Sequence, residues 1–188
     1  MVGDDMSIVD NNKALTERYP FLLPRNIFTD APDEDYDYTY IRGVDNLPRG
    51  WKWLFLQMCE DIRNQLVKEN CLHSFRFFDI KEKYNRMECY PHGCSSKIHH
   101  ILDKYAYMSQ YVCSVCGQPA QWETNGYVLS FCDKCYKENN IQSTAETIVL
   151  TTPSYKVIKL KNGIRTYHTY SFKREWKRYL DTMNEKTA

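Results

Sequence analysis

The chain has 188 residues and a mass of 22.4 kDa, with 43% hydrophobic and 26% charged residues. These values are typical of folded globular proteins and exclude a disordered or collagen-like chain, and the length excludes a large multidomain enzyme. The formal net charge is only +1, but the charges are segregated: residues 1–50 carry 5 Lys/Arg against 10 Asp/Glu, and residues 151–188 carry 9 against 3. We therefore expect one acidic and one basic surface, which influence the choice of partner more than the fold.

Hydropathy gives no indication of a membrane segment. The longest apolar runs, such as residues 53–56, are far shorter than the roughly 18 residues that cross a bilayer. The first five residues are acidic, whereas a secretory leader begins with basic residues. We expect a soluble cytoplasmic protein without a membrane partner.

The first fifty residues predict one short helix followed by an irregular segment. Asp10 is placed to cap a helix that runs to Arg18, and the prolines at 20 and 24 end it because proline disfavours helix at and before its own position. Residues 30–40 (DAPDEDYDYTY) are acidic and rich in tyrosine, without helical periodicity. We call this segment the acidic wrap and expect an exposed loop.

The middle of the chain predicts two helices that flank a hairpin. Apolar residues recur at spacings of three and four between residues 50 and 70, which is typical of a helix with one buried face. The residues of that face are Trp51, Leu54, Phe55, Met58, Cys59, Ile62, Leu66 and Val67. Aromatic-rich segments at 75–80 and 85–90 favour a hairpin across 81–84. Ser95 or Ser96 is then placed to cap a helix with an apolar face formed by Ile98, Ile101, Leu102, Tyr105 and Met108.

Three strands and a helix are expected after a polar break at 137–143. The strands are predicted at 147–151, 155–160 and 164–172, and Asn162-Gly163 between the last two favours a tight hairpin turn. A basic helix follows at 171–183. The resulting prediction is an α+β fold with helices on a small antiparallel sheet, a four-cysteine zinc ribbon and a C-terminal β-hairpin plus helix. The domain prediction is a core at 1–110, the zinc ribbon at 111–140, and a hairpin and helix at 141–188 that pack on the core.

One motif indicates specific chemistry. Cys113 and Cys116 form one C-x2-C pair and Cys132 and Cys135 a second, 15 residues apart, which is within the spacing of a four-thiolate zinc site. Segments 121–123 and 127–131 around Asn125-Gly126 favour the hairpin of a zinc ribbon, and Gly117 supplies the permissive backbone that the first pair needs. A disulfide would require an oxidising compartment, and a dithiol redox centre requires only one pair. Four thiolates fill the coordination shell, so we expect one structural zinc per chain.

The other cysteines and the histidines leave two weaker alternatives. Cys89, His92 and Cys94 could hold a second metal, although their spacing is irregular, and Cys59 is expected in the core. The pair His99-His100 beside a zinc ribbon is reminiscent of ββα-metal nucleases, but it falls inside a predicted helix. The sequence has no phosphate loop, nucleophile elbow or H-E-x-x-H helix. We therefore expect neither catalysis nor a small-molecule substrate.

Several segments together resemble a known group of proteins. They are YPFLLPRN at 19–26, the helix that begins at Gly50-Trp51, FDIKEKY at 78–84, and the helix that leads into the paired cysteines. Over residues 15–140 they are similar to small uncharacterised zinc-binding proteins of bacteria and phages, and more narrowly to zinc-containing anti-CRISPR proteins. The chain departs from the group at 85–90, where a glycine-containing segment is usual, and in the basic region after residue 144. The resemblance implies stoichiometric inhibition of the RNA-guided nuclease of a type II system.

Two partner surfaces follow from the charge pattern. The acidic wrap, whose Asp33, Glu34, Asp35, Tyr36, Asp37, Tyr38 and Tyr40 combine carboxylates with aromatic area, is predicted to bind a basic surface on a host defence nuclease. The alternative function is a zinc-ribbon nucleic-acid-binding accessory protein, in which Lys173, Arg174, Lys177 and Arg178 share a helix face and contact phosphates. A near-neutral whole chain favours the protein partner.

Overall fold

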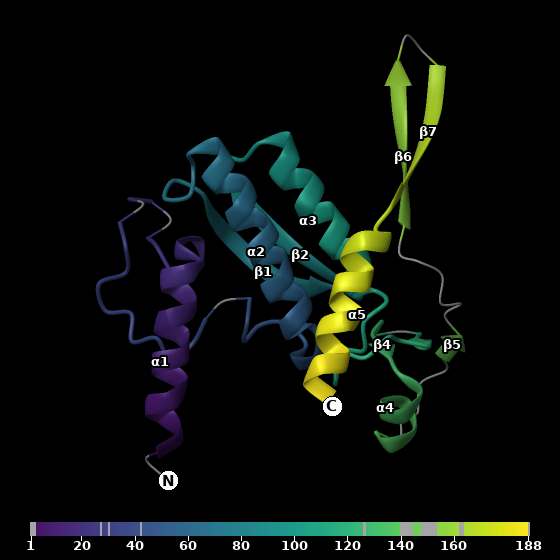
Figure 1. Cartoon of the computed structure of the whole chain (residues 1–188), viewed down its shortest axis with the longest axis horizontal. Coiled ribbons are helices and arrows are strands. Elements are labelled where there is room, and N and C mark those ends of the chain that lie inside the picture. Colours follow the sequence, from purple (N-terminus) through teal and green to yellow (C-terminus); the bar gives the residue numbers. More distant parts are fainter. Residues whose placement is uncertain are drawn as a thin grey trace.

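The structure, a computed structural model, describes residues 3–26, 28–29, 31–41, 43–125, 127–139, 145–147, 154–161 and 164–187. Within these residues it contains five α-helices and three small antiparallel sheets. Two helices lie on a hairpin in the centre, a small sheet surrounds the paired cysteines, and a second hairpin leads into the last helix (Figure 1). This arrangement confirms the predicted α+β fold. No described helix is both long enough and apolar enough to span a bilayer.

The core is built around α2 (Lys52–Glu69), which follows a short 3-10 turn, η2 (Arg49–Trp51). Its inward face is buried as predicted, and Trp51 before it is fully buried. Val67 is the exception, because it is 49% exposed and lies beside the apolar stripe. Asn70 ends the helix in the left-handed conformation, with φ of 55°, and its backbone N–H bonds back to the last turn.

The central hairpin pairs β1 (Arg76–Lys83) with β2 (Arg86–His92). Its turn is formed by Tyr84 and Asn85, both with positive φ, so it comes later than the predicted 81–84. Helix α3 (Ser96–Ser109) covers the same face of the hairpin as α2 (Figure 1). The cap of α3 is Ser95, one of the two predicted candidates, whose hydroxyl accepts from the backbone N–H of Ile98 at 3.3 Å.

The N-terminal helix is longer than predicted. Helix α1 spans Gly3–Arg18 instead of starting at Asp10, and the acidic residues 4 and 5 fall in its first turn, where the helix dipole favours negative charge. The 3-10 turn η1 (Pro20–Leu22) then buries Phe21, whose ring lies 5.5 Å from that of Phe75. The segment from there to η2, which includes the acidic wrap, passes beside α1 at one side of the molecule (Figure 1).

In its described residues, the chain after the cysteines contains three strands and one helix. Strand β5 (Ala145–Thr147) joins the small sheet around the cysteines, and residues 148–151 of the predicted strand lie outside the described part of the chain. Strands β6 (Ser154–Lys161) and β7 (Ile164–Ser171) form the predicted hairpin, whose turn residues 162–163 are also outside it. Helix α5 (Lys173–Thr187) packs on α2, where the Gln57 side-chain amide donates to the Glu175 carbonyl at 3.0 Å. The side chains of Phe172, Tyr179 and Met183 are buried in the core.

Candidate metal centre

The structure brings together the four predicted cysteine sulfurs. Their Sγ atoms all lie within 4.8 Å of one another, and those of Cys116 and Cys132 are 3.6 Å apart. A tetrahedral ion with metal–sulfur bonds of about 2.3 Å places its ligand atoms about 3.8 Å apart, so the spacing fits four thiolates around one ion. The four cysteines therefore form a candidate metal site.

Two backbone turns aim the sulfurs at one point. After the first pair, Gly117 adopts a φ of 83° and its N–H donates to the Cys113 carbonyl at 3.0 Å, which closes the turn. In the second pair, Cys132 caps α4 (Asp133–Glu138), and its sulfur accepts from the backbone N–H of Cys135 at 3.4 Å. The short strands β3 (Trp122–Thr124) and β4 (Ser130–Phe131) join the two turns as the predicted hairpin, although Gly126 lies outside the described residues. We call residues 112–139 the metal module.

The electrostatics of the site show what a bound cation would have to supply. Burial raises the pKa of Cys113, but backbone N–H groups from Cys132, Cys116 and Val115 outweigh this effect and lower it below the ordinary thiol value. Burial raises the pKa of Cys116 to about 11 and also raises that of Cys135. Several adjacent thiolates are costly to form without a positive charge between them. The donor set therefore fits a divalent, thiophilic ion, which would offset that cost.

The metal module is anchored in the core through its first turn. The backbone N–H of Gly50 donates to the Ser114 carbonyl at 2.9 Å, and the Trp51 indole N–H donates to the Val112 carbonyl at 3.1 Å. From α5, the Tyr179 hydroxyl donates to the Gly117 carbonyl at 2.6 Å. A Cβ on Gly50 would collide with the Cys113 carbonyl oxygen and lie 2.7 Å from the Gly117 nitrogen. The sequence marks Gly50 only as a residue next to a helix, so this close contact was not predicted.

A second anchor comes from the turn of the central hairpin. Asn85 is fully buried there, and its side-chain amide donates to Ser130 Oγ at 2.6 Å and to Glu123 Oε2 at 3.0 Å. The Asn85 backbone N–H and the Tyr127 hydroxyl both donate to the Glu82 carboxylate, at 2.7 and 3.1 Å. From the sequence, Asn85 was expected only to begin the second strand of the hairpin. The structure shows that it joins the core to the metal module.

The remaining cysteines and histidines do not gather in the same way. Cys59 is buried and Cys89 is half-buried, and desolvation raises the pKa of both thiols. His92 is exposed, with its ring 4.8 Å from that of Phe78. Across the part of the chain that the structure describes, no second group of His, Cys, Asp or Glu brings three ligand atoms together. His99 and His100 lie on the exposed side of α3.

The acidic wrap is exposed except for the half-buried Tyr36 and Tyr38, and its Asp30 lies outside the described residues. Its carboxylate residues Asp33, Glu34, Asp35 and Asp37 are all exposed, as is Tyr40. The rings of Tyr36 and Tyr38 lie 4.6 Å apart, and the Tyr36 hydroxyl donates to the Tyr40 carbonyl at 2.6 Å. From α1, the Asn12 amide donates to the Tyr38 carbonyl at 2.7 Å. The wrap thus presents four carboxylates on a segment held by its own tyrosines and by α1.

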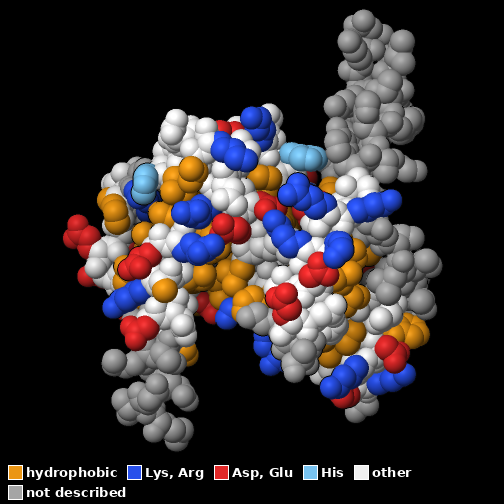
Figure 2. Space-filling view, viewed as in Figure 1, with side chains coloured by type: hydrophobic (Ala, Val, Ile, Leu, Met, Phe, Trp, Pro, Cys, Tyr) orange, Lys and Arg blue, Asp and Glu red, His pale blue; other side chains and the backbone are white. Residues whose placement is uncertain are grey.

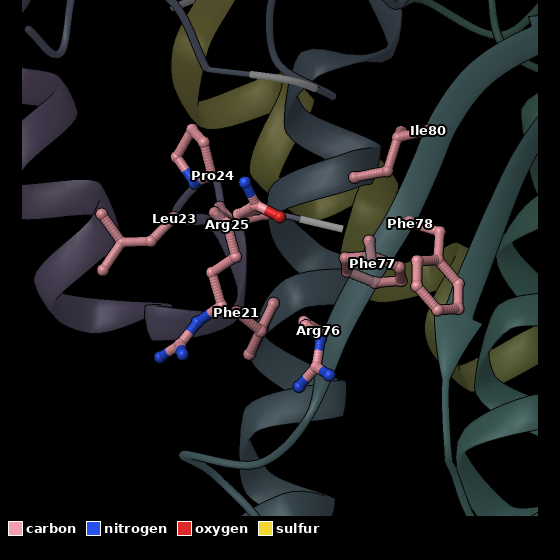
Figure 3. A pocket seen from close by; sticks show the side chains of 10 residues that line it. Phe21, Leu23, Pro24, Arg25, Arg76, Phe77, Phe78 and Ile80 are labelled. Atoms are coloured by element: carbon pink, nitrogen blue, oxygen red, sulfur yellow. The ribbon is translucent and has the colours of Figure 1, made fainter. Parts of the chain in front are cut away.

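A pocket opens beside this segment, between η1 and β1. It is lined by apolar side chains, among them Phe21, Leu23, Pro24 and Phe77, with two arginines at its edge (Figure 3). Phe28, in the loop that follows, is 89% exposed, and its backbone N–H donates to the Asn26 side chain at 2.9 Å. An apolar region therefore lies next to the carboxylates of the wrap.

The four predicted basic residues of α5 differ in their pairing. Arg178 Nη2 lies 2.9 Å from both oxygens of Asp61, and Lys177 pairs with Asp181 at 2.8 Å. Lys173 and Arg174 are exposed, and neither has an ion pair among the described residues. Of the hairpin β6–β7 only the backbone is described. Two of the four predicted cations are therefore engaged within the protein.

Comparisons with models of known protein families, with curated proteins and with solved structures found no match to this chain.

Proposed function

We propose that the protein is a non-catalytic interaction protein whose fold is stabilised by one zinc ion. The observation that carries this proposal is the convergence of four sulfurs within 4.8 Å of one another. Zinc is the ion that such four-thiolate ribbons usually hold, and a full shell leaves no position for water or substrate. The ion would therefore support the fold and take no part in a reaction.

The acidic wrap is the surface that we assign to the partner. The backbone that carries its exposed carboxylates is held by hydrogen bonds to Tyr36 and Asn12, which lowers the entropy cost of association, and Phe28 adds an exposed aromatic side chain nearby. A carboxylate cluster complements an Arg/Lys-lined groove and competes there with phosphates. The partner that we propose is a nucleic-acid-binding protein of a host, with the RNA-guided nuclease of a type II CRISPR system as the first candidate. The protein would then be an inhibitor encoded by a phage or another mobile element.

Elemental analysis tests the metal. We expect one zinc per chain in the purified protein and a marked loss of thermal stability in Cys113→Ser. Protein without zinc, or an unchanged melting temperature for the variant, would contradict the structural ion.

A cleavage assay tests the partner. A type II nuclease with its guide RNA is mixed with an equimolar amount of the protein, and cleavage of a target plasmid is measured. We expect inhibition by the native chain and its loss in Glu34→Lys with Asp35→Lys. The matched control reverses two other exposed carboxylates, Asp103→Lys with Glu185→Lys, and should inhibit normally.

Two other outcomes of this assay test separately whether the nuclease is the partner and whether the acidic wrap is the docking surface. No inhibition by the native chain would remove the nuclease as partner. If the native chain inhibits and the wrap variant inhibits equally well, the wrap is not the docking surface.

A further inference from the structure

The segment between β5 and α5 differs in composition from the rest of the chain. From Thr147 to Arg174 it contains no Asp or Glu, whereas it carries six cationic residues: Lys156, Lys159, Lys161, Arg165, Lys173 and Arg174. The other long stretch without Asp or Glu, residues 104–122, carries only one cation, Lys104, so the strong positive charge is confined to this segment and the start of α5. Such a concentration of cations favours a polyanionic partner.

The hairpin formed by β6 and β7 projects from the body of the protein (Figure 1). Its eight residue pairs, from Ser154 opposite Ser171 to Lys161 opposite Ile164, make a two-stranded sheet to which no other described strand is added. An isolated two-stranded hairpin is only marginally stable in water. We call strands β6 and β7 the basic arm, whose β6 strand contacts α3 while the hairpin extends beyond the body (Figure 1).

A groove lies on the body near the end of the arm, between α2, α3 and α5. Its charged lining consists of four cations, Lys68, Lys104, Arg174 and Arg178, and two carboxylates, Asp61 and Glu175. Lys and Arg side chains, with some Asp and Glu between them, are spread over the face formed by these helices (Figure 2). The groove thus continues the positive charge of the arm onto the body.

The two carboxylates of the groove are already paired inward. Glu175 accepts from the ammonium group of Lys104 at 2.9 Å, and Lys104 is itself only 11% exposed. Asp61 accepts from Arg178 and, at 2.7 Å, from the Tyr105 hydroxyl. Lys68 and Arg174 are exposed, and neither has an ion pair among the described residues. Their charges therefore remain available to an anion in the groove.

We propose that the basic arm and this groove together bind double-stranded DNA. The major groove of B-DNA admits a two-stranded β-ribbon, whereas the major groove of double-stranded RNA is too deep and narrow for one. With the arm in the major groove, we assign the flanking phosphates to Arg174, three residues after the arm, and to Lys68, which lines the same groove on the body. This surface is separate from the acidic wrap, and the inference does not depend on the proposed protein partner.

Fluorescence anisotropy with a labelled 20-base-pair DNA duplex tests the proposal, using the full chain at 50 to 200 mM salt. Two double variants are compared with the native protein: Lys159→Ala with Arg165→Ala in the arm, and Lys68→Ala with Arg174→Ala in the groove. Each lost phosphate contact reduces the magnitude of the slope of log affinity against log salt by about 0.9. At 0.1 M salt this corresponds to a loss of affinity of up to about eightfold per contact. We expect each double variant to bind about 10- to 60-fold more weakly, with a slope smaller by about 2.

The matched control removes two lysines of α4, in the metal module and away from the arm. Lys134 and Lys137 are 78% and 71% exposed, and Lys134→Ala with Lys137→Ala should bind DNA like the native chain. Metal content and melting temperature establish that each variant is folded.

Three results would overturn the proposal. The first is no binding of the duplex by the native chain at 50 mM salt, and the second is an equal loss in the control and in the two test variants. The third is equal or tighter binding of single-stranded DNA or of an RNA duplex of the same length. A loss confined to the groove variant would overturn the assignment of the arm.

Discussion

Replacing Gly50 with alanine should detach the metal module from the core. The added Cβ would collide with the Cys113 carbonyl oxygen and lie 2.7 Å from the Gly117 nitrogen and 2.9 Å from the Ser114 carbonyl carbon. All three neighbours belong to the backbone of the first cysteine turn, so none can rotate away. The turn itself has to move, and it carries two of the four metal ligands.

The cost can be estimated from the contacts that this movement breaks. Besides an exposed bond from Arg49 to the Val115 carbonyl, three hydrogen bonds hold the turn and its flank on the core: those donated by Gly50, by the indole of Trp51 and by Tyr179. At about 1 kcal/mol each they contribute about 3 kcal/mol, and overpacking adds about 1–3 kcal/mol. We therefore expect Gly50→Ala to lower the free energy of unfolding by about 4–6 kcal/mol, a large share of the 5–15 kcal/mol typical of a domain.

Urea unfolding, with metal content measured in parallel, checks this estimate. Gly93→Ala is the control, because an added Cβ there meets nothing within 4 Å and only its φ of 49° is unfavourable, at about 1–2 kcal/mol. Tyr179→Phe removes a single hydrogen bond to the same turn and should cost about 1 kcal/mol. If Gly50→Ala loses no more stability than Gly93→Ala and keeps its metal, the reasoning is refuted.

Three further predictions concern other contacts. Asn85→Ala should lower the free energy of unfolding by about 1–3 kcal/mol in a urea titration, because it leaves Ser130 and Glu123 without their donor. Burial by itself raises the pKa of Glu175, but the hydrogen bond from Lys104, a backbone hydrogen bond and the charges of Lys104 and Arg178 together outweigh burial and lower the pKa below the usual 4.5. The stabilising contribution of this pair is therefore complete above about pH 4.5 and is lost as the pH falls through the lowered pKa. In Glu175→Gln the melting temperature should therefore fall less steeply between about pH 6 and pH 3 than in the native protein. Metal affinity should fall as the pH is lowered from 8 to 6, since binding requires thiolates, and competition with a chromophoric chelator measures it.

The local elements were predictable because each has a short-range signal. The apolar stripe of α2, the Ser95 cap of α3 and the paired cysteines depend on spacings of a few residues, and the structure contains all of the corresponding elements. The start of α1 was placed at Asp10 because a capping residue is the usual marker, whereas the helix begins at Gly3 with acidic residues in its first turn. Such boundaries depend on weak local preferences.

The connections between elements were not predictable for a different reason. Gly50 lies against the cysteine turn, Asn85 against Ser130, and Arg178 against Asp61, across 117 residues in the last case. No periodicity or spacing in the sequence brings these residues together, because the contacts arise only when the elements pack. For the same reason, Lys177 and Arg178 were predicted to be available to phosphates, although each forms an ion pair within the chain.

The two ends of the basic arm are supported by the same part of the protein. Strand β5, before the arm, pairs with β3 of the metal module, and α5, after it, holds the Gly117 turn through Tyr179. If a metal ion orders the four cysteines, a chain without that ion would have no ordered support at either end of the arm. Metal binding would then determine the direction of the arm as well as the order of the cysteine turns.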